Sequence, residues 1–189
     1  MKLRSIAVAA LLALTLAGCA SAPETPSVQD ELATSLGISG LSAEQAIDQL
    51  DATPLADRTQ AAFASIRGDR LILMSADQKK QAELPITGDK FYLSIAPFVT
   101  ETHDCFFHSL TTCVGELQDA AIDVTITDTA SAKVLFEEQT DTFNNGFFGV
   151  WLPRNIEVEV EIRYEGMTAT TLLQTTPDAP TCITTMQLK

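Results

Sequence analysis

Hydrophobic and polar residues alternate most regularly near the C-terminal end of this 189-residue chain. From Ile156 to Tyr164 every second residue is apolar or aromatic, and glutamate or arginine fills all the positions between them. A period of two residues predicts a β-strand with one buried face and one face in solvent. Glu165 and Gly166 are typical of a hairpin tip, so we expect residues 168–173 to return beside that strand.

Further apolar patterns predict an antiparallel β-sandwich-like domain over residues 88–189. The expected strands are separated by turn signals at roughly ten-residue intervals, as is common in sandwiches. In addition to the hairpin, they fall at 91–99, 122–127 and 134–136. The apolar run 147–152, which is bounded by glycine and proline, is interpreted as core.

Helical spacing is typical of the region before this domain. Ser42 is followed three positions later by Gln45, a capping-box pattern, and apolar residues then recur on one helical face. A second helix is expected from Thr53, as its N-cap, to Gly68, as its stop signal. The apolar run 70–75 is expected to form a buried strand or a dimer contact.

These patterns predict an α+β fold class, with a small helical N-terminal domain over residues 36–87 followed by the β-rich domain over 88–189. Two short helices bury little apolar surface by themselves. The helical domain is therefore expected to pack against the rest of the chain or against a second copy of itself, which makes a homodimer one predicted arrangement.

The first residues predict export and lipid attachment. Lys2 and Arg4 precede a short apolar stretch, and the run Leu-Ala-Gly-Cys at 16–19 looks like the lipobox of bacterial lipoproteins, in which the cysteine is acylated. The apolar stretch is shorter than the ~20 residues that cross a bilayer core. A permanent transmembrane helix is therefore not expected there.

We predict a signal peptide over residues 1–18, an acylated Cys19, and a flexible tether with two prolines over 19–35. Cleavage after Ala20 or Ala22 without a lipid is the alternative. Because alanine and not aspartate follows Cys19, placement at the outer membrane is favoured over the inner membrane, on the periplasmic side. The lipid is the sole membrane attachment that we expect.

The net charge of the chain disfavours negatively charged partners. The chain has 12 basic and 25 acidic residues, which gives a formal charge of −13. A surface this acidic repels nucleic acid and anionic lipid surfaces, so neither is an expected partner.

Export also changes how the cysteines are interpreted. An oxidising compartment requires each thiol to be bridged, acylated, metal-bound or kept reduced. Without Cys19, three cysteines remain: Cys105, Cys113 and Cys182. An odd number means that one disulfide would still leave one thiol to explain.

Reactive side chains are concentrated between His103 and Cys113. This short run contains both histidines of the chain, His103 and His108, and two of the three remaining cysteines, Cys105 and Cys113. It follows a predicted strand and is therefore expected to be a loop. Cys182, near the C-terminus, is expected to lie on a terminal strand that brings a third sulfur to the same place.

This donor set is typical of a soft metal ion. Thiolates favour Cu(I) and zinc, and imidazole is compatible with both. Structural zinc sites usually contain cysteines paired at the short C-x2-4-C spacing, and this loop has no such cysteine pair. Three sulfur atoms from distant positions fit trigonal Cu(I), so copper is the predicted cofactor.

Three long motifs resemble the CueP family of periplasmic copper-binding proteins. They are residues 103–117, 147–154 and 180–188. The resemblance implies a role in copper tolerance, with Cys105, Cys113 and Cys182 as ligands. It also implies a two-domain subunit whose helical part dimerises, and a role in supplying copper to an envelope enzyme such as a copper,zinc superoxide dismutase.

His103 and His108 are candidate ligands because of their position in the loop, and not because of the resemblance. Two other interpretations stay open. In the first, Cys105 and Cys113 form a structural disulfide and Cys182 is a buried small hydrophobic residue. In the second, thiols of the site reduce Cu(II) and become bridged. Sequestration and hand-off, without turnover, remain the expected role.

Overall fold

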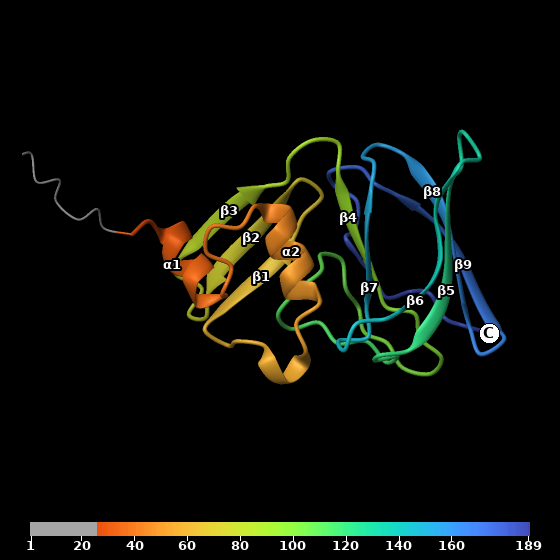
Figure 1. The fold of residues 1–189 in the computed structure, drawn as a ribbon, viewed down its shortest axis with the longest axis horizontal. Coiled ribbons are helices and arrows are strands. Elements are labelled where there is room, and N and C mark those ends of the chain that lie inside the picture. Colours follow the sequence, from red (N-terminus) through yellow and green to blue (C-terminus); the bar gives the residue numbers. More distant parts are fainter. Residues whose placement is uncertain (1–25) are drawn as a thin grey trace, which may run out of the picture.

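The computed structural model describes residues 26–189 (Figure 1). Two short α-helices and three β-sheets make up the fold, which confirms the predicted α+β class. The predicted signal peptide, Cys19 and the first part of the tether lie outside the described residues. Within the described part, no helix has the length and apolar character needed to cross a membrane.

The N-terminal half consists of two helices on a small sheet (Figure 1). Helices α1 (Val28–Ser35) and α2 (Ala43–Asp51) each begin with a capping box, at Ser27 and Ser42 respectively. Strands β1 (Ala62–Ile66), β2 (Arg70–Ser75) and β3 (Gln81–Pro85) form an antiparallel sheet in that order. One face of this sheet and the two helices share a single apolar core.

Two predictions in this region are wrong. Instead of a helix from Thr53 to Gly68, the chain makes a short 3-10 turn (η1, Leu55–Asp57) and then β1. Pairing with β2 buries alternate residues of β1, and this gain outweighs the helical propensity of its alanines. Helix α1 also occupies residues that we expected to be flexible tether, because it buries Leu32 and Ala33 against the core.

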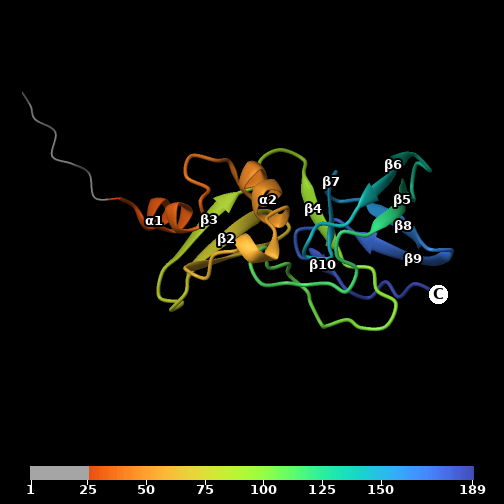
Figure 2. The ribbon, with the colours of Figure 1, turned by 60° about the horizontal axis from the view of Figure 1, so that its bottom comes forward.

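The remaining strands form the sandwich that the alternating pattern predicts. Its first sheet has the order β10-β4-β7, with β4 at Phe91–Ile95, β7 at Phe148–Leu152 and β10 at Cys182–Ile183. Figure 2 shows β10 beside β4, to which it pairs in parallel. The apolar run 147–152 is therefore largely a core strand, as predicted.

The second sheet is antiparallel and has the order β6-β5-β8-β9. Its strands are β5 (Ala121–Asp128), β6 (Val134–Asp141), β8 (Glu157–Tyr164) and β9 (Met167–Gln174). Strands β8 and β9 form the predicted hairpin around Glu165 and Gly166. Apolar residues of both sheets meet in one core between them.

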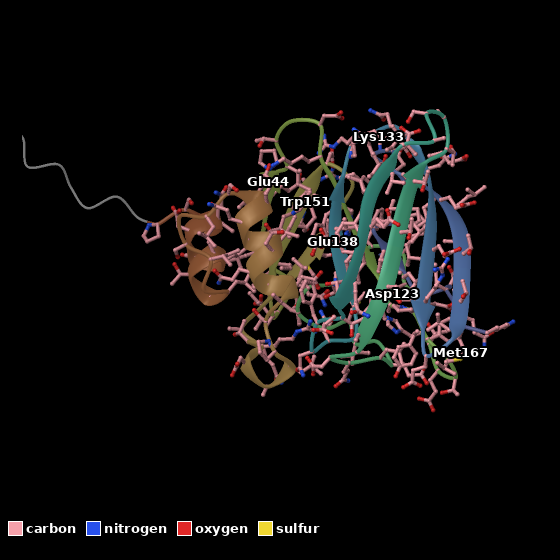
Figure 3. All side chains as sticks on the ribbon, turned by 45° about the vertical axis from the view of Figure 1, so that its right-hand side comes forward. Glu44, Asp123, Lys133, Glu138, Trp151 and Met167 are labelled. Atoms are coloured by element: carbon pink, nitrogen blue, oxygen red, sulfur yellow. A yellow bond between two sulfur atoms is a disulfide. The ribbon has the colours of Figure 1, made fainter. Side chains whose placement is uncertain are left out.

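The two halves meet along α2 and the first sheet of the sandwich. Trp151 on β7 faces α2 (Figure 3), and its indole nitrogen donates to Oδ1 of Asp48 on that helix at 2.7 Å. Tyr92 on β4 and Leu110 from the loop after β4 belong to the N-terminal core. The loop that carries the predicted metal donors therefore lies at the junction of the two halves.

Candidate metal centre

Backbone hydrogen bonds fix the long loop between β4 and β5 at two points. Its middle pairs with the edge of β1: Ile66 donates to the carbonyl of His108 at 2.8 Å, and Leu110 donates to the carbonyl of Ala64 at 2.9 Å. Further on, the backbone N–H of Gly115 donates to the carbonyl of Asn145 at 2.7 Å. Cys113, which lies between these points, is therefore held on a defined scaffold.

At Gly115 the loop lies so close to the turn before β7 that no side chain fits. A Cβ at this position would come within 2.6 Å of the carbonyl oxygen of Gly146 and 2.9 Å of the Ala96 side chain. Glycine here permits the close approach that places Cys113 next to the first sheet of the sandwich.

All three predicted sulfur atoms meet at this junction. Cys105 and Cys182 form a disulfide, with their Cα atoms 5.7 Å apart. Cys113 is the free cysteine among the described residues, and its Sγ lies 3.7 Å from Sγ of Cys105. The Cys105–Cys113 bridge of the structural interpretation is therefore wrong, although Cys182 is indeed buried, with 2% of its surface exposed.

The two predicted histidines lie on either side of the sulfur atoms. His108 is fully buried, and its Nδ1 is 3.6 Å from Sγ of Cys182. One set of donors consists of His103, Cys105 and Cys113, and the other of His108, Cys113 and Cys182; within each set the donor atoms lie within 4.8 Å of one another. Both sets include Cys113, which makes its thiol the centre of the arrangement.

A buried carboxylate that the motif search did not identify completes the site. Asp51, the last residue of α2, accepts at Oδ1 a hydrogen bond of 3.1 Å from Nε2 of His108. Its other oxygen, Oδ2, accepts from the Tyr92 hydroxyl at 2.8 Å, and the side-chain amide of Asn145 donates to Oδ1 at 2.9 Å. Both Asp51 and His108 have fully buried side chains.

The pattern of α2 contained a signal for Asp51. The buried residues of the helix recur at positions 43, 46, 47, 50 and 51, so the aspartate lies on the apolar face. Helix C-termini also disfavour negative side chains. An aspartate that ends a buried stripe at a helix C-terminus therefore indicates a specific polar partner, here His108.

Charges in the site favour a protonated His108 imidazole beside the Asp51 carboxylate, and they lower the pKa of the Cys113 thiol. Burial lowers the pKa of His108, but the adjacent Asp51 carboxylate outweighs it and raises the pKa to about 9. Burial likewise raises the pKa of Asp51, yet His108 and the hydrogen bonds to the carboxylate hold it below its usual value. For Cys113, burial raises the pKa, while His108 and Arg58 lower it overall.

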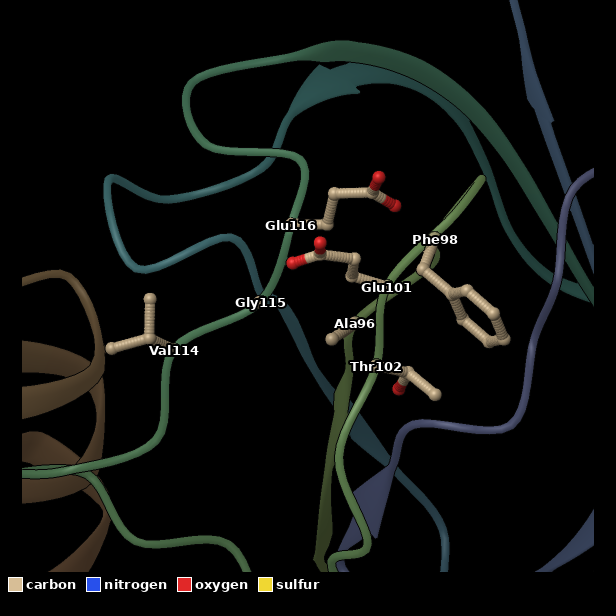
Figure 4. A pocket seen from close by; sticks show the side chains of 7 residues that line it. All are labelled: Ala96, Phe98, Glu101, Thr102, Val114, Gly115 and Glu116. Atoms are coloured by element: carbon tan, nitrogen blue, oxygen red, sulfur yellow. The ribbon is translucent and has the colours of Figure 1, made fainter.

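A cavity of about 240 Å³ flanks the centre on its sandwich side (Figure 4). Glu101, Thr102, Val114 and Glu116 are among its lining residues. The carboxylate of Glu116 already accepts hydrogen bonds from the backbone of Val99 and Thr100. Because no cysteine or histidine lines this cavity, it adjoins the metal donors without being the site itself.

The donor chemistry fits a soft ion once the disulfide is open. Sulfur atoms in a bridge carry no thiolate charge, so in the bridged form Cys113 is the one cysteine of the cluster that can supply a thiolate. Opening the bridge would give three thiolates with imidazole nitrogens next to them. Such a set suits Cu(I) better than it suits hard cations.

The fold and the centre together define an α+β protein with a cluster of sulfur and imidazole groups, suited to a soft metal ion, at the junction of its two halves. The chain belongs to the CueP family of periplasmic copper-binding proteins, whose family model matches residues 45–187. Among solved structures, that of S.CueP is 38% identical, with a TM-score of 0.79; the match covers 88% of this chain and 100% of that chain. No curated protein matches the chain.

Proposed function

We propose that this chain is a periplasmic lipoprotein that sequesters Cu(I) through the thiolates of Cys105, Cys113 and Cys182. The observation that carries the proposal is the meeting of these three sulfur atoms, although Cys182 is 69 residues beyond Cys113 in the sequence. Nδ1 of His108 is the nitrogen donor that we assign to the same ion, because it lies next to Cys182 inside the core. His103 borders the more exposed side of the cluster.

Copper uptake in this proposal depends on reduction of the Cys105–Cys182 bridge. Two electrons and two protons from a dithiol donor convert the bridge to two thiols, and the donor becomes a disulfide. Cu(I) then replaces thiol protons as it binds. The bridged and copper-bound forms are therefore alternative states of the same sulfur atoms.

The cellular role that we propose follows from export and from the family. Acylated Cys19 would anchor the protein in the outer membrane, facing the periplasm. There it would protect against copper and supply the ion to an envelope enzyme such as a copper,zinc superoxide dismutase. The N-terminal half is proposed to mediate a homodimer.

The disulfide supports a second candidate function, which is thiol-coupled reduction of Cu(II). When Cys105 and Cys182 are reduced, their two thiols would give two electrons to two Cu(II) ions. The products are two Cu(I) ions, the bridge seen in the structure, and two protons. Each chain would act once unless an external dithiol reopened the bridge.

Cu(I) titration of the reduced protein against a competing chelator, under anaerobic conditions, tests sequestration. We expect one tightly bound ion per chain, and an affinity lower by on the order of 100-fold or more in Cys182→Ser and Cys113→Ser. Cys19→Ser is the control, since it removes the sulfur that we expect to be acylated and not one of the three proposed ligands. Equal affinities in wild type and Cys182→Ser would contradict the three-thiolate site.

Mixing the reduced protein with excess Cu(II) separates the second candidate from the first. If the bridge forms at the expense of Cu(II), Cu(I) produced and thiols lost should be equal in number. Cys105→Ser should abolish this reaction because it cannot form the bridge. Thiol loss without Cu(I) formation would contradict copper reduction.

A further inference from the structure

We propose that Asp51 is a positioning residue for the metal centre: it holds Nε2 of His108 and thereby presents Nδ1 of the imidazole to the sulfur atoms. The inference rests on the proposed copper site, with His108 as its nitrogen donor. It assigns a role in that site to the N-terminal half, which contains no cysteine in the described part.

The first support is that both ends of the imidazole have a defined neighbour. Nε2 donates to Oδ1 of Asp51 at 3.1 Å, and Nδ1 lies 3.6 Å from Sγ of Cys182. The ring also packs against Phe147 at a tilt of 51°, with the two ring centroids 4.4 Å apart. A flipped or rotated ring would lose the carboxylate, so one nitrogen alone is available to a metal ion.

The second support is that the carboxylate itself is fixed from several elements. Its hydrogen-bond donors come from β4 (Tyr92 and Ser94), the turn before β7 (Asn145) and the loop (His108). Asn145 donates in addition to the backbone carbonyl of Asp51 at 3.1 Å. Asp51 therefore has little freedom to move away from His108.

The third support is that β7 has a glycine, Gly149, where the hydrogen bonds around the Asp51 carboxylate need space. A Cβ on Gly149 would overlap the hydroxyl of Tyr92 and come within 2.9 Å of Oδ2 of Asp51. Gly149 thus permits the buried carboxylate and phenol to meet at this point. Burial of an ionised aspartate costs several kcal/mol unless it is paired and hydrogen-bonded, and here four side chains satisfy it.

A carboxylate on the far nitrogen has a known effect on a metal-binding imidazole. It selects the tautomer, fixes the ring orientation and increases the basicity of the ligand nitrogen. Asp51 is placed to exert each of these effects on His108 from the end of α2, across the junction between the two halves. The geometry therefore makes the N-terminal half part of the metal centre without donating a ligand.

The test compares Asp51→Asn with Asp48→Asn. Both substitutions replace a carboxylate of α2 by an amide, and both change a hydrogen bond across the junction. Asp51 bonds to His108, whereas Asp48 bonds to Trp151, away from the sulfur atoms. We expect Asp51→Asn to weaken Cu(I) binding about 10- to 100-fold, and Asp48→Asn to leave it unchanged. His108→Ala should cause a loss similar to that of Asp51→Asn, and the double variant should lose little more.

Copper X-ray absorption gives a readout that general destabilisation would not change. Wild type should show sulfur and imidazole scattering, and Asp51→Asn should retain the sulfur signal with a weakened imidazole signal. If Asp51→Asn does not fold, proton–nitrogen NMR of copper-loaded wild type provides the test. Nε2 of His108 should carry a proton protected from exchange, and Nδ1 should carry none.

The failures of the two proposals are distinguishable. If wild type binds Cu(I) through three sulfur atoms but Asp51→Asn and His108→Ala bind it equally well, the positioning role is wrong and the thiolate site stands. Metal on Nε2 in the NMR spectrum would also overturn the positioning role. If wild type shows no tight Cu(I) binding, the proposed function fails, and the role of Asp51 in it fails as well.

Discussion

The two halves of the molecule contribute different chemistry to the junction between them. The β10 strand and the loop after β4 carry all three sulfur atoms, in Cys105, Cys113 and Cys182. The N-terminal half contributes polar and charged groups: Asp51 bonds to His108, and Arg58 donates to the carbonyl of Cys113 at 2.8 Å. The sandwich half thus contains the sulfur atoms, and the N-terminal half contacts the loop that carries two of them through Asp51 and Arg58.

This difference explains why the site is at the junction and not in either core. Each half has its own apolar cluster, and neither cluster includes the charged pair of Asp51 and His108. A third, smaller cluster, formed by Ala96, Phe147 and the three cysteines, lies where the halves meet. Substitutions in the two halves should therefore have different effects on stability and on Cu(I) affinity.

The largest expected effect is the loss of the bridge in Cys182→Ser. This disulfide joins residues 77 positions apart, so its removal should lower the free energy of unfolding by about 2–5 kcal/mol. Denaturant unfolding of the oxidised proteins measures it. Cys113→Ser keeps the bridge and should unfold close to wild type; an equal loss in both variants would show that the bridge is not the cause.

An intermediate effect is expected from Gly149→Ala, which tests whether a change in the sandwich reaches the carboxylate of the other half. The new Cβ overlaps Tyr92 and crowds Asp51, so stability should fall by about 1–3 kcal/mol and Cu(I) affinity should fall with it. Chemical denaturation and chelator competition measure the two quantities.

Val150→Ala is the matched control for this prediction. Val150 is the next residue of β7, and it faces the core of the sandwich instead of Asp51. It should cost comparable stability through the cavity that it leaves, without changing Cu(I) affinity. A similar loss of affinity in both variants would mean that copper binding follows global stability and not the carboxylate network.

The smallest expected effect concerns a contact wholly inside the N-terminal half. Partial burial raises the pKa of Glu44, but hydrogen bonds from the backbone and hydroxyl of Thr87 dominate and lower it from 4.5 to about 2. Because the folded pKa is lowered, this stabilisation is complete above about pH 4.5 and is lost as the pH falls through about 2.

Glu44→Gln should therefore lower the free energy of unfolding by about 0.5–1 kcal/mol near neutral pH, and by less at pH 2 to 3. Urea unfolding across this pH range measures the difference. Copper affinity near neutral pH should not change, since Glu44 bonds to Thr87 and not to a residue of the candidate site. A difference that grows toward low pH would contradict the assigned cause.

Sequence patterns predicted the sandwich better than the N-terminal half. The β8–β9 hairpin has a strict period of two and a strong turn, so its local signals agree with its tertiary environment. Residues 62–66 mix small side chains with Phe63 and Ile66, a pattern that suits either a helix or a strand. Pairing with β2 decides their structure, and that long-range contact has no local signal.

The site was predicted in part, for similar reasons. Scarcity and spacing identified the cysteines and histidines, but spacing alone does not determine which sulfur atoms are bridged. The nearer pair in sequence, Cys105 and Cys113, is not the one that is joined, because β10 brings Cys182 next to Cys105. Asp51 was missed because its partner lies 57 residues further along the chain.

The backbone around the bridge has a consequence for repeated use of the site. The carbonyl of Phe106 accepts hydrogen bonds from the backbone N–H groups of Thr181 at 2.9 Å and Cys182 at 3.1 Å. These bonds, together with the pairing of the loop to β1, do not depend on the sulfur–sulfur link. If the link is cleaved as the proposed function requires, these bonds would keep the freed thiols as neighbours, so the proposed cycles of reduction, loading and reoxidation would require no refolding of the chain.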